Sequence, residues 1–347
     1  MKLITTTKDL DIIIARIMEV EASKQGFVTV DTEFVRESTY YPKLCLIQIG
    51  GSEESILVDP LANGIDLSSL FDLMRNSRIV KVFHAARQDL EIFYYLMNEI
   101  PSPIFDTQIA AMVCGYGESV GYEALVNDIA KTVIDKSARY SNWIQRPLTT
   151  KQLKYALSDV IHLRVIYEKL LEILEKEERV SWIEEEMNIL AAQKTYQVQE
   201  GDLWKKIKPL RTDPAYLVRL QKLAAYRECE AQKANCPRAR MIRDEVIAYA
   251  ALASVKRPED LEDVIKRFQK GLGERVIKGM FVELNEASLV PQDLWPKLPA
   301  KPASFNNLGT SVDLLRVLLK AKSIEHRVAE KLIATTPDLE KIAALSN

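Results

Sequence analysis

Hydrophobic positions follow two patterns along this chain, and the change from one to the other divides it. In the first 115 residues, short aliphatic and β-branched runs alternate with segments whose apolar residues recur every three or four positions. The runs Phe27–Phe34, Leu44–Gly50, Ser55–Pro60 and Arg78–Ala85 are typical of strands. Residues 66–77, "DLSSLFDLMRNS", form an amphipathic helix pattern, so the strand after them is expected to pair parallel to an earlier strand. This part predicts a mixed α/β sheet with flanking helices.

Beyond this region no further strand pattern occurs, and the rest of the chain is expected to be helical. The later segments read, in order, as helix at 108–199, a linker at 201–214, helices at Tyr216–Lys233 and Arg243–Val255, a proline-rich linker at 294–307, and helix at 311–347. The last helical segment is short for a domain that folds alone.

The composition does not identify a function, but it indicates the number of domains and the cellular compartment. The chain has 347 residues, more than one ordinary domain needs, and 47 Lys and Arg against 49 Asp and Glu, so its net charge indicates no partner. Its four cysteines are widely spaced and form no CxxC motif, which favours reduced thiols over a disulfide frame or a zinc site. No apolar run approaches the roughly 18 residues of a membrane span. We therefore expect a soluble cytoplasmic protein with no membrane partner.

Two acids interrupt the first strand, whose sequence is "FVTVDTEF". Asp31 and Glu33 are two residues apart, so they lie on the same face of the strand. Two adjacent carboxylates repel each other unless a cation or a shared proton relieves them. A strand end that emerges into solvent would also tolerate them, and for this pair alone that is the commoner explanation.

Two helical segments add further acids. Asp89, in "FHAARQDLEIFYYL", falls in the first turn of a helix, where an acid also complements the helix dipole. Tyr155 and Asp159 are one turn apart and share a helix face. His84 is interpreted as structural. Taken singly, each position is also compatible with a structural role, but together four carboxylates and a tyrosine are typical of a two-metal phosphodiesterase.

Other catalytic classes fit less well. With only three histidines, a histidine-rich zinc hydrolase is not indicated. The chain also contains no GxxxxGK[ST] phosphate-binding loop of the kind that NTPases use.

The order and context of these motifs resemble a known family. "VDTEF", "HAARQD" and "YALSD" are similar to the three motifs of DEDD-superfamily 3′→5′ exonucleases, in the subclass with Tyr-x-x-x-Asp. Residues 134–160, "IDKSARYSNWIQRPLTTKQLKYALSDV", resemble the ribonuclease D family, and residues 235–264 resemble its helical HRDC module. The resemblance implies an RNase H-like exonuclease domain at 1–205, an HRDC domain at 206–290, and a linker with a partial second HRDC-like region at 291–347.

The resemblance also implies a role for each motif residue. Asp31 would bridge two divalent ions, Mg²⁺ or Mn²⁺. Glu33 and Asp159 would complete the site of the attacking water, and Asp89 would support the second ion. Tyr155 would orient the water. The implied activity is metal-dependent release of 5′-mononucleotides from RNA 3′ ends, with tRNA precursors as the substrate by the same resemblance.

Residues 136–146 combine cations and aromatic rings, which suits phosphates and a stacked base. From the residues alone, Trp143 as a core side chain and the cations as a solvated face are the plainer interpretation. With the resemblance, Lys136 and Arg146 are expected to bind substrate, and Trp143 is included with them. Phe34 either stacks on a terminal base or belongs to the core.

The helical module carries a mild positive charge. Residues 211–290 hold 15 Lys and Arg against 12 Asp and Glu, an excess of 3, which supports weak contact with an RNA backbone. Arg238, Arg240 and Arg243 are the candidates for that contact, and a solvated face explains them equally well.

Two alternatives stay open from the sequence. The same chemistry could act on DNA, because contacts to the 2′-hydroxyl cannot be located from one sequence. A non-catalytic RNA-binding scaffold would also carry such helical modules, although every motif position is filled.

Overall fold

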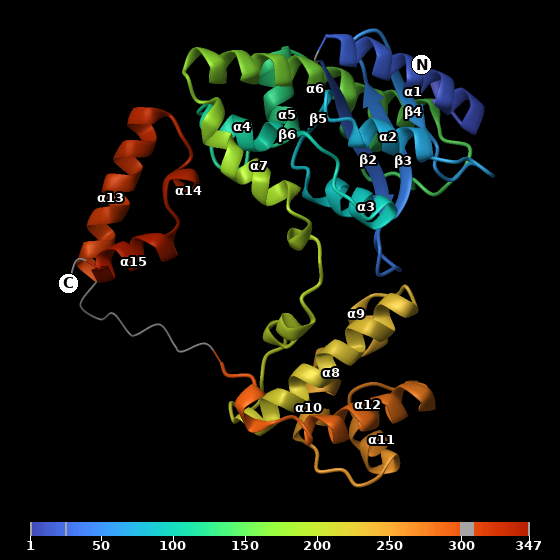
Figure 1. The fold of residues 1–347 in the computed structure, drawn as a ribbon, viewed down its shortest axis with the longest axis vertical. Coiled ribbons are helices and arrows are strands. Elements are labelled where there is room, and N and C mark those ends of the chain that lie inside the picture. The colour runs from blue at the N-terminus through green and yellow to red at the C-terminus, as the bar shows by residue number, and fades with distance from the viewer. Residues whose placement is uncertain (1, 25, 299–308, 346–347) are drawn as a thin grey trace. The chain divides into compact units, whose positions relative to one another are not determined.

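A computed structural model describes residues 2–24, 26–298 and 309–345 (Figure 1). Within these residues the chain divides into two compact units. The first unit comprises residues 1–35, 44–196 and 304–347, and the second comprises residues 36–43 and 197–303.

The first unit is built on a six-stranded mixed sheet in the order β1-β4-β3-β2-β5-β6 (Figure 1). The strands are β1 Lys2–Ile4, β2 Phe27–Val35, β3 Lys43–Gly50, β4 Ser55–Val58, β5 Val80–Phe83 and β6 Ile104–Asp106. The pairs β1/β4, β2/β5 and β5/β6 are parallel, and β3/β4 is antiparallel. The four expected strands are confirmed, including the parallel return after the helix. The strands β1 and β6 were missed because three residues are too few to show alternation.

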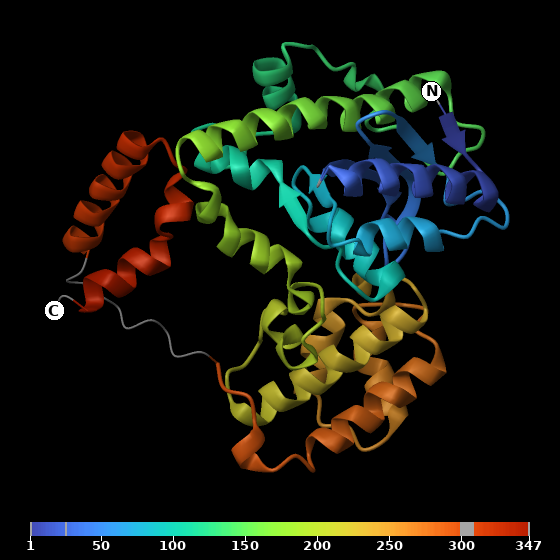
Figure 2. The same ribbon diagram turned by 45° about the horizontal axis from the view of Figure 1, so that its top comes forward.

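Helices cover both faces of this sheet (Figure 2). The helices α1 (Thr7–Ser23), α2 (Ser68–Arg75) and α3 (Arg87–Met97) contribute to one hydrophobic core, which includes Val28 and Val30 of β2. The long helix α6 (Thr150–Lys176) and the shorter α4 (Thr107–Val113) contribute to the cores of the opposite face. Because side chains alternate along a strand, Thr29, Asp31 and Glu33 of β2 point away from the core that holds Val28 and Val30.

The remaining elements of the first unit are short. They are α5 Tyr122–Leu125, a π-helical turn Val126–Ala130, 3₁₀ turns at Lys136–Ala138, Val180–Ile183 and Gln193–Thr195, α7 Glu184–Ala191, and the C-terminal helices α13 Gly309–His326, α14 Glu330–Ile333 and α15 Thr336–Leu345. The mainly helical segment expected at 108–199 contains α4, α5, α6 and α7, and it is interrupted most extensively at 131–149, which forms a loop with a single 3₁₀ turn. The helix expected at 311–347 is confirmed in the described part.

In residues 197–298 of the second unit, all regular elements are helices or 3₁₀ turns. Its elements are a 3₁₀ turn Glu200–Lys206, α8 Pro214–Lys233, α9 Arg238–Met241, α10 Asp244–Leu252, α11 Pro258–Lys266, α12 Glu274–Ala287 and a 3₁₀ turn Gln292–Leu294. The linker expected at 201–214 is wrong in its first half, because Leu203 and Trp204 are buried in the core of this unit. Most of the linker expected at 294–307 lies outside the described residues.

Residues 36–43, which follow β2 in the chain, group with the helices of the second unit. Tyr40 is buried there, and its hydroxyl donates to Glu228 and accepts from Arg238 at 3.0 Å and Gln232 at 3.2 Å. Asn235 Oδ1 accepts the Tyr40 backbone N–H at 3.1 Å. Arg238 is therefore held by an ion pair with the buried Glu228, which accounts for it without RNA.

Among the described residues, no helix combines the length and the apolar character that crossing a bilayer requires.

The close approach of α6 to the sheet depends on a glycine. Arg164 of α6 donates to the carbonyls of Phe27 at 3.1 Å and Gly50 at 3.0 Å. A Cβ atom at Gly50 would lie 2.4 Å from Thr29 Oγ1 and 3.1 Å from the Val160 carbonyl oxygen. No side chain fits between β3, β2 and α6 at this point.

We expect Gly50→Ala to lower the free energy of unfolding by about 1–3 kcal/mol, the usual cost of overpacking a core. Thermal and urea unfolding followed by circular dichroism would measure it. Gly273→Ala is the control, because a Cβ there meets no atom within 4 Å. Equal stability of the two variants would contradict this account of the β2–α6 contact.

Candidate active site

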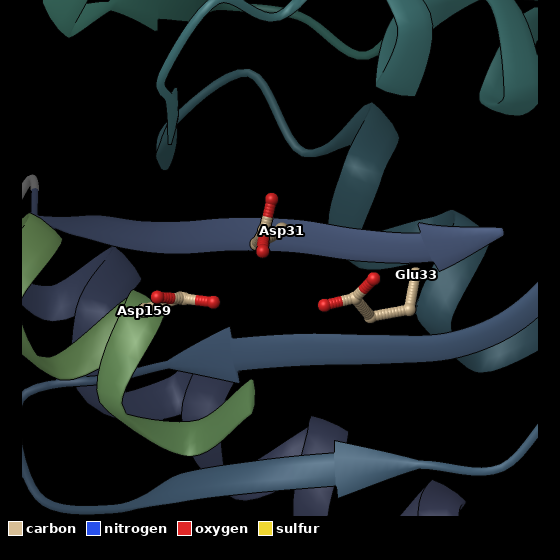
Figure 3. Close-up of side chains that lie close together, drawn as sticks. All are labelled: Asp31, Glu33 and Asp159. Atoms are coloured by element: carbon tan, nitrogen blue, oxygen red, sulfur yellow. The ribbon is translucent and has the colours of Figure 1, made fainter. Parts of the chain in front are cut away.

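Three carboxylates converge between β2 and α6 (Figure 3). Asp31 and Glu33 come from one face of β2, and Asp159 comes from α6. One ligand oxygen from each residue lies within 4.8 Å of those of the other two. The start of α6 is fixed by a capping box between Thr149 and Gln152, which sets where Asp159 falls along the helix.

Asp89 lies beside this group but outside the 4.8 Å cluster. It sits in the first turn of α3, is 8% exposed, and accepts a hydrogen bond from the Thr32 hydroxyl of β2. Burial and the charge of Asp31 raise the pKa of Asp89 well above its usual value. Asp89 and Asp31 are therefore close enough for the charge of Asp31 to raise the pKa of Asp89.

Asp106, at the end of β6, holds the turn that begins α3. Its two carboxylate oxygens accept the backbone N–H groups of Ala85 at 3.0 Å and Ala86 at 2.8 Å. Ala85 adopts a left-handed conformation with φ of 55°, which this pair of bonds stabilises. Sequence reasoning missed Asp106, because the three-residue strand before it gave no pattern. Its position explains how Asp89 is aimed at β2.

The acids of the site hold their protons more tightly than free carboxyls do. Burial raises the pKa of Asp31 to about 6. Burial, together with the charge of Asp31, raises the pKa of Asp159 to about 9. Burial and the charges of Asp31, Asp159 and Asp89 raise the pKa of Glu33 to about 10. The protein alone therefore cannot hold all these charges at neutral pH, which is the condition that a cation relieves.

The donor set fits a divalent cation of the Mg²⁺ or Mn²⁺ class. These ions prefer oxygen ligands, and the clustered carboxylates supply them at a spacing that one ion can span. Asp31, Glu33 and Asp159 would hold such an ion directly.

Tyr155 lies one helical turn before Asp159 and lines the same cavity. Burial and the charges of Asp159, Glu33 and Asp31 raise the pKa of its hydroxyl, so the phenol stays protonated. A hydrogen bond from Tyr155 partly offsets the raised pKa of Asp159.

The acids line a cavity of about 610 Å³. Of the residues expected to bind substrate, Phe34 and Lys136 line this cavity. Phe34 also packs against the hydrophobic core. Lys136 forms an ion pair with Glu123 at the cavity wall, and both side chains remain partly exposed.

Trp143 and Arg146 do not line the cavity. Trp143 is 3% exposed and packs in a core with Leu46 of β3. Arg146 binds both oxygens of the buried Asp59, at 2.6 and 2.7 Å, and also donates to the Cys45 carbonyl at 2.6 Å. These contacts correct the expectation that the two residues bind substrate: the plainer interpretation of Trp143 holds, and Arg146 is committed to the fold.

Arg139 and Tyr140 belong to the cationic and aromatic segment at 136–146 but were given no individual role from the sequence, and His84 was interpreted as structural. Arg139 lowers the pKa of Glu33 and Asp159, and its guanidinium lies 5.3 Å from the ring of Tyr140, which is 89% exposed. His84 lines the cavity while its Nδ1 atom lies 3.0 Å from Thr107 Oγ1. Their sequence signals were weak, because a charged loop and a lone histidine are common in any fold.

Comparison with known proteins identifies the class that this fold and site define. A sequence model of the family described as 3′-5′ exonuclease matches residues 1–175. The ribonuclease D of Bartonella henselae is 43% identical over 99% of this chain and 83% of its own length. That of Nitrobacter hamburgensis is 44% identical, over 99% of this chain and 88% of its own.

Solved structures agree with this result. The chain resembles Escherichia coli RNase D with a TM-score of 0.83 and 28% identity, covering 99% of this chain and 90% of that one. The catalytic core of RRP6 from Trypanosoma brucei shares the fold, with a TM-score of 0.59 and 17% identity over 83% of this chain and 79% of that one.

The chain belongs to the ribonuclease D family and is a 3′→5′ exoribonuclease. The resemblance inferred from the motifs is confirmed, and so is the fold class, an RNase H-like exonuclease domain followed by a helical region. The non-catalytic scaffold is set aside.

The raised pKa values predict how pH affects the metal-free protein. A carboxyl whose pKa is higher in the folded than in the unfolded chain favours folding at low pH, and this contribution is lost as pH rises through the folded pKa. Between about pH 4 and 10 the three acids should therefore increasingly destabilise the metal-free fold. The melting temperature in EDTA should fall as pH rises, and the increase on adding Mg²⁺ should grow from pH 5.5 to pH 9.

Scanning fluorimetry with EDTA and with Mg²⁺ would measure both trends. Glu33→Gln should flatten the pH dependence, because it removes the acid with the highest of these values. A Mg²⁺-induced shift of the same size at every pH would count against the site.

Proposed function

We propose that this exoribonuclease hydrolyses the 3′-terminal phosphodiester of structured RNA with two divalent ions, Mg²⁺ or Mn²⁺, at the cluster of Asp31, Glu33, Asp159 and Asp89. The observation that carries the proposal is the convergence of three ligand oxygens within 4.8 Å of one another at the wall of a cavity. When bound, the ions lower the pKa of the attacking water and stabilise charge on the leaving 3′-oxygen.

The residues of the chain have separate tasks in this proposal. Asp31 would serve as a ligand shared by both ions. Glu33 and Asp159 would hold the ion beside α6, and Asp89 would support the other ion from α3. Tyr155 keeps its proton, and with the ions bound its hydroxyl would donate to the water that it orients rather than to Asp159.

The RNA strand enters along the loop that follows α5. Lys136 and Arg139 supply positive charge at the wall of the cavity, and the exposed ring of Tyr140 offers a surface for stacking a base. Phe34, next to Glu33 on β2, borders the terminal nucleotide from the opposite side.

The substrate class is RNA with a structured body, and tRNA precursors are our specific proposal. Escherichia coli RNase D is described as an exoribonuclease involved in structured RNA processing, and the likeness to it covers nearly all of this chain. We assign residues 206–290 to an HRDC domain, and the excess of 3 positive charges within its residues 211–290 favours weak RNA contact. None of the four cysteines forms a disulfide, which suits the cytoplasm.

Asp31→Asn is expected to lower kcat by more than about a hundredfold. Mutation of residues that only support a metal ligand costs up to about a hundredfold, and Asp31 is proposed to be a ligand itself. The measurement is mononucleotide release from a 3′-labelled tRNA carrying a 3′ extension, with Mg²⁺ or Mn²⁺ and with EDTA. A matched DNA oligonucleotide tests the substrate class. Full activity of Asp31→Asn with an intact fold would remove the metal assignment.

Lys136→Ala and Arg146→Ala should separate substrate binding from folding. Loss of Lys136 should raise KM and reduce the slope of log affinity against log salt by about 0.7, the value for one phosphate on a single strand. Loss of Arg146 leaves Asp59 buried and unpaired, at a cost of about 3–5 kcal/mol in the free energy of unfolding. Salt-dependent RNA binding and urea unfolding distinguish the two variants. A large loss of stability in Lys136→Ala, together with a change in the salt dependence of binding in Arg146→Ala, would refute this assignment.

A further inference from the structure

Tyr122 places a hydroxyl group on the helix turn that carries Asp159. It is the first residue of α5, and its side chain lines the cavity beside the acids. Its hydroxyl donates to the carbonyl oxygen of Asp159. The tyrosine therefore binds α6 at the turn that begins with Asp159. Its ring lies 5.5 Å from that of His84.

Thr29 binds the neighbouring residue of α6 from the sheet. It is fully buried on β2, two residues before Asp31, and its hydroxyl lies 2.8 Å from the Val160 carbonyl oxygen and 3.3 Å from that of Gly50. Two hydroxyls from two separate elements therefore bind the carbonyls of consecutive residues in one helix.

These bonds add little to the helix itself. The carbonyls of residues 159 and 160 lie in the interior of α6, where the helix already provides an N–H partner four residues later. What the hydroxyls can fix is the position and rotation of α6 relative to β2 and α5. Asp159 has a short side chain, so its carboxylate follows any movement of this turn.

The acids create a force that such contacts must resist. Asp31 is partly buried and Asp159 is buried, their ligand oxygens lie within 4.8 Å of each other, and the two carboxylates repel each other whenever both are ionised. A metal site needs its ligand oxygens held to within about 0.5 Å before the ion arrives.

We propose that Tyr122 and Thr29 are positioning residues that hold the Asp159 turn of α6 against β2, so that the carboxylates keep the spacing that a divalent ion requires. This inference rests on the proposed role of Asp159 as a metal ligand. Neither residue has to touch the ion or the RNA for this role.

Mn²⁺ binding without RNA tests the inference independently of turnover, with free Mn²⁺ measured by electron paramagnetic resonance. Tyr122→Phe keeps the ring and removes only the hydroxyl, and it should weaken Mn²⁺ binding about tenfold, as loss of a group that orients a metal ligand does. Thr29→Val should act in the same direction, while Thr29→Ser should restore binding to within about twofold of the unchanged protein, because it keeps the hydroxyl. At subsaturating Mn²⁺, kcat should fall and KM for RNA should stay the same.

Tyr196→Phe is the matched control, because it removes a tyrosine-to-carbonyl bond of 2.9 Å to Leu190 and Tyr196 does not line the cavity. Wild-type Mn²⁺ affinity in Tyr122→Phe would overturn the inference, and so would an equal loss in Tyr196→Phe. Asp159→Asn distinguishes a failure of the metal assignment from a failure of the positioning role. If it binds Mn²⁺ normally, the metal assignment itself fails; if it does not bind while Tyr122→Phe binds normally, only the positioning role fails.

Discussion

Carboxylates that share one buried cavity are the constraint on which the catalytic unit depends. Burial and mutual repulsion raise the pKa values of Asp31, Glu33 and Asp159. A fold that only had to be stable would not collect acids at the end of a central strand. The cost is tolerable because hard cations replace protons at the same oxygens, which couples the charge state of the site to metal binding.

The architecture keeps these acids together by bonding two helices, α3 and α6, to one strand. Asp31 and Glu33 lie on β2 itself, and Thr32 of the same strand donates to Asp89 at the start of α3. Thr29, four residues before Glu33, donates to α6. The pairing of β2 with β5 covers Phe27–Thr29, whereas β2 continues to Val35. Asp31 and Glu33 therefore lie in the part of β2 beyond its pairing with β5, and the site is assembled there.

The sequence indicated candidate site residues where a residue type is unusual in its surroundings. Acids at alternating strand positions, and Tyr155 one turn before Asp159, stand out against their hydrophobic surroundings, and the structure brings the three closest acids together. The strands long enough to alternate were predicted, whereas β1 and β6 were too short. Asp106 and Tyr122 could not be predicted, because their roles depend on backbone groups that only the folded chain brings near. A side chain that bonds to a backbone group needs no particular residue type as its partner, so the sequence contains no pattern that reveals the contact.

The segment that made the family resemblance so specific is largely a folding element. Within "KS…W…RPLT", Trp143 is buried, and Arg146 binds the buried Asp59 and donates to three carbonyls, so both residues secure the loop before α6. Lys136, in contrast, keeps part of its charge exposed at the cavity. A motif can therefore identify a family through residues that never meet the substrate, since a loop that must deliver Tyr155 and Asp159 accurately is as restricted as the site itself. Recognition from sequence and assignment of roles are separate inferences, and only contacts distinguish them.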